Sequence, residues 1–304
     1  MISYVENKNI DRGRWDKTIA ASANGLVFAY SWFLDTVSER WDALIEDDYK
    51  YIFPLPRKSK FGFRYIHQPV FTNQLGIFSA EPISSEKVNS FLENIPSAFR
   101  HVELGLNFSN TLYGNYFCIT ALAAQHIDLS GGYESIGQGY SDNLKRNLRK
   151  AEASGMKIIL NVSPESVTEY FRKAKGDALK IYDDNDYRTL TKLIKLLIEK
   201  QQGFTAGVYA PDNSMIAAAG FMFSNNRIFY LKGAANAHGR EINAMHFLMD
   251  NIFRQQAGKK MYFDFGGSVI PSLARFYKSF GAQDYFYQHV KMNRLPFYLR
   301  WLKK

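Results

Sequence analysis

The chain has little cysteine and no long apolar run. Its one cysteine, Cys118, excludes an intrachain disulfide and a zinc site built from cysteines. The longest apolar run, residues 215–223, is about half as long as a membrane-spanning helix. The first eight residues become polar too early for a secretory signal. We therefore expect a cytoplasmic protein that has no transmembrane segment and is stabilised by an apolar core.

Several catalytic signatures are also missing. The sequence has no nucleophilic-serine elbow, no P-loop and no dinucleotide-binding fingerprint. His238 and His246 lie eight residues apart and could share one helix face, but no carboxylate completes a metal site with them. We therefore expect no metal and no permanently bound cofactor. Acidic residues are outnumbered, with 29 Asp and Glu against 38 Lys and Arg. The net charge of +9 favours anionic ligands such as nucleic acid, phosphorylated cofactors or acidic lipid head groups.

The chain divides into two halves at a glycine-rich segment, residues 130–139, which has the composition of a linker. Each half contains three strand-like runs joined by tight turns, followed by a helix and a further strand. The first turns, at Asp47 and Asp212, are about 165 residues apart. Chance is the alternative, because such meanders are common. The pattern predicts a mixed α/β sheet in each of two domains, 1–135 and 136–304, with a helical segment at 140–203 in the second.

A basic helix is predicted directly after the glycine-rich segment. Ser141 has the position of an N-cap, and Leu144, Leu148 and Ala151 recur at helical spacing. Four cations lie three to four residues apart and would form one stripe: Lys145, Arg146, Arg149 and Lys150. Such a stripe can bind the phosphates of an RNA, a nucleotide-linked substrate or a cofactor. The alternative is a solvated helix face, on which Asp142 and Glu152 are partial counter-charges.

Three segments resemble a known family. Phe276-Tyr277-Lys278-Ser279-Phe280-Gly281 resembles a short helix of the GNAT acyltransferases, whose tyrosine often protonates the leaving thiolate of coenzyme A. Residues 141–155 resemble the helix that joins the two GNAT-like domains of Fem-type proteins, and residues 263–268 resemble a strand end of the same group. These blocks occur in the expected order from about residue 139 to 290. The Fem-type group includes aminoacyl-tRNA-dependent peptidoglycan bridge enzymes and acetyltransferase-like relatives.

The resemblance implies two tandem GNAT-like domains and an acyltransferase. Such an enzyme moves an acyl or aminoacyl group from acyl-CoA or aminoacyl-tRNA, as co-substrate, to an amine acceptor such as a cell-envelope precursor. Tyr277 would be the general acid. The donor or substrate would contact the four stripe cations and the residues Lys232, Gly233, Asp264, Gly266 and Gly267. The alternatives are a core role for Tyr277 and a simple tight turn at Gly266 and Gly267.

Two departures from the family pattern predict a different class of function. The pyrophosphate loop of GNAT enzymes has glycines three and five residues after an arginine, and here Asn243 and Met245 follow Arg240 at those positions. The bridge enzymes often have Phe-Lys where this chain has Phe276 and Tyr277. The alternative function is therefore a non-catalytic binding protein on a GNAT-like scaffold that recognises an anionic ligand.

The last segment, residues 291–304, combines five Lys and Arg residues with six large apolar side chains and has no acid. A basic amphipathic end of this kind predicts a peripheral contact with a membrane surface. Pro296 limits the length of any helix there, so the alternative is docking of the segment onto the protein body.

Overall fold

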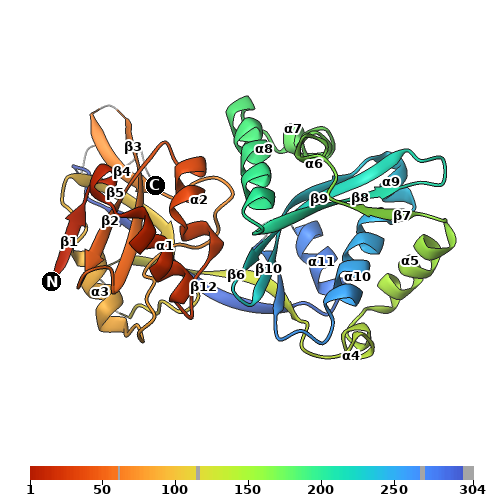
Figure 1. Ribbon diagram of the computed structural model, residues 1–304, viewed down its shortest axis with the longest axis horizontal. Helices are drawn as coiled ribbons and strands as arrows, with labels where there is room; N and C mark the ends of the chain where they lie inside the picture. The colour runs from red at the N-terminus through yellow and green to blue at the C-terminus, as the bar shows by residue number, and fades with distance from the viewer. Residues whose placement is uncertain (61, 114–116, 268–270, 297–304) are drawn as a thin grey trace. The chain divides into compact units, whose positions relative to one another are not determined.

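The computed structural model describes residues 1–60, 62–113, 117–267 and 271–296 (Figure 1). Its contacts divide the chain into two compact units. Unit 1 contains Met1–Ala123 together with the described residues from Phe286 onward, and unit 2 contains Ala124–Tyr285. The chain passes from one unit to the other within two strands, β6 (Cys118–Asp128) and β12 (Gln283–Asn293).

Unit 1 is built on a mixed sheet. Its strands follow the order β1 (Ile2–Val5), β2 (Arg40–Glu46), β3 (Tyr51–Lys60), β4 (Phe63–His67), β5 (Phe99–Gly105) and β12. Its helices are α1 (Arg12–Ala21), α2 (Ser31–Val37) and α3 (Ser85–Glu93). Fully buried aromatic side chains form its core, and the Trp15 and Trp41 rings lie 5.0 Å apart.

Unit 2 contains the second mixed sheet. Its strands follow the order β6, β11 (Tyr262–Gly266), β10 (Arg227–Ala235), β9 (Met215–Ser224), β8 (Gly203–Tyr209) and β7 (Lys157–Leu160). On one face lie α6 (Pro164–Phe171) and α8 (Asp184–Glu199), and on the other lie α5 (Asp142–Ala153), α10 (Ala244–Gln256) and α11 (Pro271–Ser279) (Figure 1). Both faces are therefore covered, as the nearly unbroken burial of β9 requires.

The two sheets repeat one pairing pattern. Counted from β1 in the first sheet and from β7 in the second, the first three strand pairs are antiparallel, the fourth is parallel and the fifth is antiparallel. The predicted mixed sheets and tandem repeat are confirmed. The sixth strands are exchanged, because β5 pairs with β12 and β11 pairs with β6. The units consequently differ from a division at residue 135, since the last strand completes the first sheet.

Local signals explain most helix starts in unit 2. The Ser141 side chain accepts a hydrogen bond from the Leu144 amide at 3.2 Å and caps α5. The glycine-rich segment expected to be a linker contains a helix, α4 (Tyr133–Gln138). Tertiary contacts override its composition, because Tyr133 donates a hydrogen bond to Asp250 at 2.7 Å and Ile136 is buried. Among the described residues, no helix is long and apolar enough to cross a bilayer.

Candidate active site

A parting of two strands creates the main pocket of unit 2. Strand β10 pairs with β11 only from Arg227 to Phe229, although β10 continues to Ala235. Among the described residues, no strand pairs with this edge of β10 beyond Phe229, so the edge is open there to a ligand. The register of β10 against β9 also shifts between Tyr230 and Lys232, which marks a β-bulge at the same place.

The pocket at this opening has a volume of about 400 Å³. It is lined by β10 from Tyr230, by the start of α10, by α11, by α9 (Ala237–Glu241) and by a π-helical turn, η3 (Arg172–Gly176). Gly233 belongs to its wall, and a Cβ there would lie 2.6 Å from the Ala219 Cβ on β9. Glycine is therefore needed at this position for β10 to pack against β9.

Tyr277 on α11 lines the pocket while being only 4% exposed. Its ring stacks on Phe265 at 4.3 Å. Within the described residues its hydroxyl has no hydrogen-bond partner, whereas the nearby Tyr230 hydroxyl donates to the Gly233 carbonyl oxygen at 2.9 Å. Burial raises the pKa of Tyr277, so the phenol keeps its proton at neutral pH. A buried, protonated hydroxyl facing a pocket is able to donate a proton to a ligand.

His246, at the start of α10, forms another part of the pocket wall. Its imidazole packs edge-to-face with Phe276 at 4.8 Å, and burial lowers its pKa to about 4. The ring is therefore neutral at pH 7. No group of three or more metal-ligating side chains occurs in the part of the chain that the structure describes.

Three cations lie at or beside the pocket. Lys175 on η3 and Arg240 on α9 line it, and Lys232 precedes Gly233 on β10. The Lys232 ammonium lies 5.5 Å from the ring centre of Phe171. Burial lowers the pKa of Lys232 to about 8, because an ammonium ion is poorly solvated among apolar groups. This wall of the pocket is therefore suited to an anion.

The loop between α9 and α10 keeps a backbone shape typical of glycine without having one. Asn243 adopts a left-handed conformation, with φ of 65° and ψ of 36°, which asparagine tolerates better than most residues. Because α10 begins directly after it, the positive end of that helix adds to the potential at the pocket wall. The missing loop glycine at this position is therefore compensated locally by Asn243.

Asp264 and the glycines after it have a different environment from the pocket. Asp264 is fully buried, and its carboxylate accepts hydrogen bonds from Arg227 at 2.9 Å, Tyr285 at 2.7 Å and the Gly266 amide at 2.8 Å. Burial raises the pKa of Asp264, and Arg227 opposes that rise. The Gly266 amide is thus bonded to Asp264, and Asp264 is held in place by all three donors. Gly267 is exposed, and residue 268 of the expected motif lies outside the described residues.

The basic stripe is formed as expected and lies on the solvent-facing side of α5. Its four members are exposed: Lys145, Arg146, Arg149 and Lys150. Glu152, a candidate counter-charge, pairs instead with Arg254 at 3.4 Å. The Lys150 ammonium lies 3.4 Å from the Glu241 carbonyl oxygen at the end of α9. The stripe thereby reaches the helix that carries Arg240, although its members are not part of the pocket lining.

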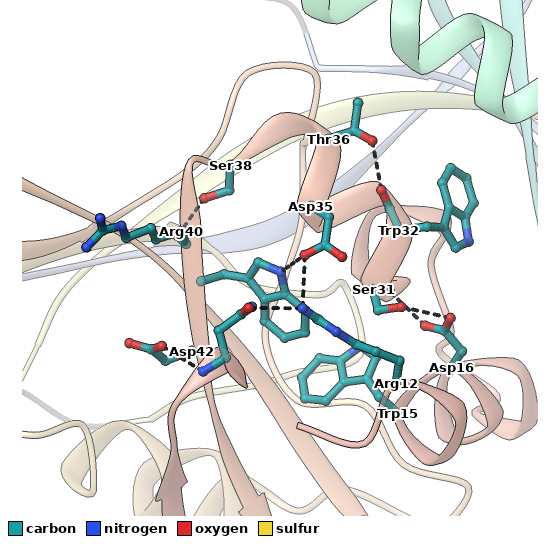
Figure 2. Close-up of polar contacts among 12 residues, drawn as sticks. Arg12, Trp15, Asp16, Ser31, Trp32, Asp35, Thr36, Ser38, Arg40 and Asp42 are labelled. Carbon is teal, nitrogen blue, oxygen red and sulfur yellow. Dashed lines mark hydrogen bonds and ion pairs between the residues drawn. The ribbon is translucent and has the colours of Figure 1, made fainter. Parts of the chain in front are cut away.

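A second cavity, of about 310 Å³, lies within unit 1 and is lined by charged side chains. Asp35 accepts hydrogen bonds from the Trp41 indole at 2.7 Å and from Arg12 at 3.2 Å (Figure 2). Asp42 is fully buried and ion-paired with Arg57. Because these acids already have partners, the pocket of unit 2 is the stronger candidate site.

The start of the C-terminal basic segment is part of the protein body. Lys291 and Asn293 belong to β12 and pair with β5, and Arg294 donates a hydrogen bond to the Ile95 carbonyl oxygen at 2.9 Å. Residues 297–304, which carry most of the expected membrane-contacting side chains, lie outside the described residues.

Sequence reasoning located Tyr277 and Gly233 but missed three residues of the pocket wall. His246 was considered only as a metal ligand, and Arg240 only as part of an eroded loop. Lys175 had no signal, because it belongs to a π-helical turn between two helices, and such turns have no simple sequence signature. The surplus of basic residues was the one indication that cations would be found there.

No family model and no curated protein matches the chain. Solved structures do. FemX matches with a TM-score of 0.69 at 12% identity, over 99% of this chain and 99% of its own. A protein of unknown function from Bacteroides thetaiotaomicron matches with a TM-score of 0.63 at 9% identity, over 96% of this chain and 100% of its own. The third match is the C-terminal domain of an Agrobacterium fabrum protein described as a lysylphosphatidylglycerol synthetase. Its TM-score is 0.57 at 10% identity, over 93% of this chain and 92% of its own. The chain therefore shares the fold of FemX over nearly its whole length, in agreement with the fold that the resemblance implied.

Proposed function

We propose that the protein is a transferase that moves an acyl or aminoacyl group from an activated donor to an amine, with the reaction taking place in the pocket of unit 2. The observation that carries this proposal is Tyr277, which lines the pocket, is only 4% exposed as a residue and has no hydrogen-bond partner for its hydroxyl among the described residues. A hydroxyl that the protein leaves unpaired at a pocket wall is available to a ligand that enters the pocket.

The proposed reaction is a direct transfer within a ternary complex. The amine attacks the donor carbonyl carbon, a C–N bond forms, and the bond from that carbon to the leaving sulfur or oxygen breaks. Backbone N–H groups on the open edge of β10 near Gly233 polarise the carbonyl. Tyr277 gives its proton to the leaving group and regains one from the attacking amine through solvent. Cys118 is exposed and belongs to unit 1, so we assign it no role as a nucleophile.

The fold relatives support the reaction class without naming the substrates. One is FemX, and another is described as a synthetase of lysylphosphatidylglycerol, a lipid that carries an aminoacyl group. For this chain we propose acyl-CoA or aminoacyl-tRNA as the donor and co-substrate, with a cell-envelope precursor as the amine acceptor. The basic stripe on α5 is proposed to hold phosphates of that donor. A peripheral membrane contact through 291–304 belongs to the same proposal.

The test is a transfer assay read by mass spectrometry, with a panel of acyl-CoA esters and aminoacyl-tRNAs as donors and small primary amines and amine-bearing cell-wall precursors as acceptors. We expect an amide product from one donor class, and Tyr277→Phe should lose most of it while keeping donor binding. Donor binding with no product from any pair would instead indicate a non-catalytic binding protein.

A further inference from the structure

Lys232 is a partly buried cation without a carboxylate partner among the described residues. Its side chain projects from the bulged part of β10 toward α6, where the ammonium lies 5.5 Å from the ring centre of Phe171 and 5.6 Å from that of Tyr182. Two aromatic faces offset only part of the cost of burying an ammonium ion. The positive charge of Lys232 therefore needs a further group of opposite charge to compensate it.

Two further cations face the same region. Burial lowers the pKa of Lys175, and the positive charges of Lys232 and Arg240 lower it further. These three residues therefore repel one another. The Arg240 guanidinium donates a hydrogen bond to the Ala235 carbonyl oxygen at 2.9 Å, which fixes it at the pocket wall.

The acids closest to Lys175 in the sequence are committed to other cations. Asp177 lies 3.4 Å from the Arg172 side chain, and Glu169 is ion-paired with Lys173. The protein thus builds, in the described part of unit 2, a wall of three cations with no compensating acid. That arrangement is electrostatically unfavourable until an anion binds.

We propose that Lys175, Lys232 and Arg240 form a binding site for a phosphate group of a substrate that occupies the pocket. A dianionic phosphate offsets two of the three positive charges, whereas a carboxylate offsets only one. Phosphate oxygens also accept hydrogen bonds from several donors at once, as two ammonium groups and a guanidinium require. The rings of Phe171 and Tyr182 keep water from Lys232, which strengthens its attraction to the anion.

This assignment rests on the proposed function only for the molecule that carries the phosphate, because the site itself is defined by its charges. Two sources share the chemistry: the nucleotide part of a donor and the diphosphate of a nucleotide-linked acceptor. Adenosine 3′,5′-bisphosphate and uridine diphosphate are the probes that separate them. The one that binds more tightly identifies the source.

The experiment measures binding without turnover. Titration calorimetry at pH 7 with inorganic pyrophosphate, the two nucleotides and acetate should show the phosphates binding and acetate not binding. Lys175→Gln, which changes a partly exposed side chain, should weaken pyrophosphate binding about tenfold or more. Lys173→Gln is the matched control, since Lys173 is exposed and paired with Glu169, and it should bind like the unaltered protein.

Thermal unfolding provides a second readout. Lys232→Met removes the buried charge and keeps the length of the side chain, so it should raise the melting temperature of the ligand-free protein by a few degrees and abolish the stabilisation by pyrophosphate. If Lys232→Met does not fold, the titration of Lys175→Gln with pyrophosphate still tests whether the site binds phosphate. Equal phosphate affinity in Lys175→Gln and the unaltered protein, or no phosphate binding at all, would overturn the assignment. Phosphate binding without any transfer activity would count against the proposed function alone.

Discussion

The Tyr230 hydroxyl donates a hydrogen bond of 2.9 Å to the carbonyl oxygen of Gly233, three residues further along β10. The bond spans the β-bulge and lies beside the pocket that Tyr277 also lines. The two tyrosines of this pocket thus differ in their hydroxyls, because the Tyr230 hydroxyl is bonded to the protein and the Tyr277 hydroxyl has no partner among the described residues.

Removing the Tyr277 hydroxyl should therefore lower turnover, whereas removing the Tyr230 hydroxyl should lower stability. Tyr277→Phe keeps the ring and should lower turnover by roughly 10²–10⁴-fold with little change in stability or donor binding. Steady-state kinetics on an identified donor and acceptor, together with a melting curve, measure both effects. A fully active Tyr277→Phe protein would sink the assignment of Tyr277 as the acid.

Tyr230→Phe is the matched variant. It removes the hydrogen bond to Gly233 and should cost about 1 kcal/mol of unfolding free energy. Chemical denaturation measures the change in stability, and circular dichroism shows whether the fold is kept. If Tyr230→Phe is as stable as the unaltered protein, the hydrogen bond across the bulge is energetically unimportant.

Asp264 should prove structural. Asp264→Asn leaves Arg227 buried without a full counter-charge and should destabilise the protein by about 3–5 kcal/mol. The control is Asp284→Asn, which breaks a partly exposed ion pair with Lys278 and should cost less than about 1 kcal/mol. Equal losses in the two variants, measured by denaturation, would mean that burial of the Arg227 pair contributes nothing extra.

Stability should depend on pH through Lys232. Burial lowers its pKa to about 8 from an ordinary value of 10.5, so between these values the unfolded chain binds the proton and the folded chain does not. The free-energy cost of burying the charged Lys232 ammonium in the folded protein is thus fully present below pH 8, and it falls as the pH rises toward 10.5. Lys232→Met should be more stable than the unaltered protein by on the order of 2 kcal/mol at pH 7, with a smaller difference at pH 10. A difference that does not change with pH would contradict this account.

The basic stripe makes a separate prediction about salt. Replacing Lys145, Arg146, Arg149 and Lys150 together by glutamine should weaken binding of a phosphate-rich donor and flatten its salt dependence, with little loss of stability. Filter binding of tRNA at several salt concentrations measures the slope. An unchanged slope would identify the stripe as an ordinary solvated helix face.

Patterns local in sequence were enough to predict most elements of both sheets and the cap of α5. The helix α4 was missed, because the contact between Tyr133 and Asp250 that holds it spans more than a hundred residues. The site was only partly predictable for the same reason. Tyr277 and Gly233 lie in recognisable segments, whereas Lys175 reaches the pocket through an irregular turn. Two of the partners of Asp264, Arg227 and Tyr285, come from other strands, β10 and β12.

The exchange of the sixth strands has a consequence for synthesis on the ribosome. Strand β6 is synthesised well before its partner β11, and the first sheet stays open along β5 until β12 has been synthesised after the rest of unit 2. Until then β5 presents unpaired backbone groups to other chains. A nascent chain therefore cannot finish its amino-terminal unit first, because the first sheet is complete only after all of unit 2 has been synthesised.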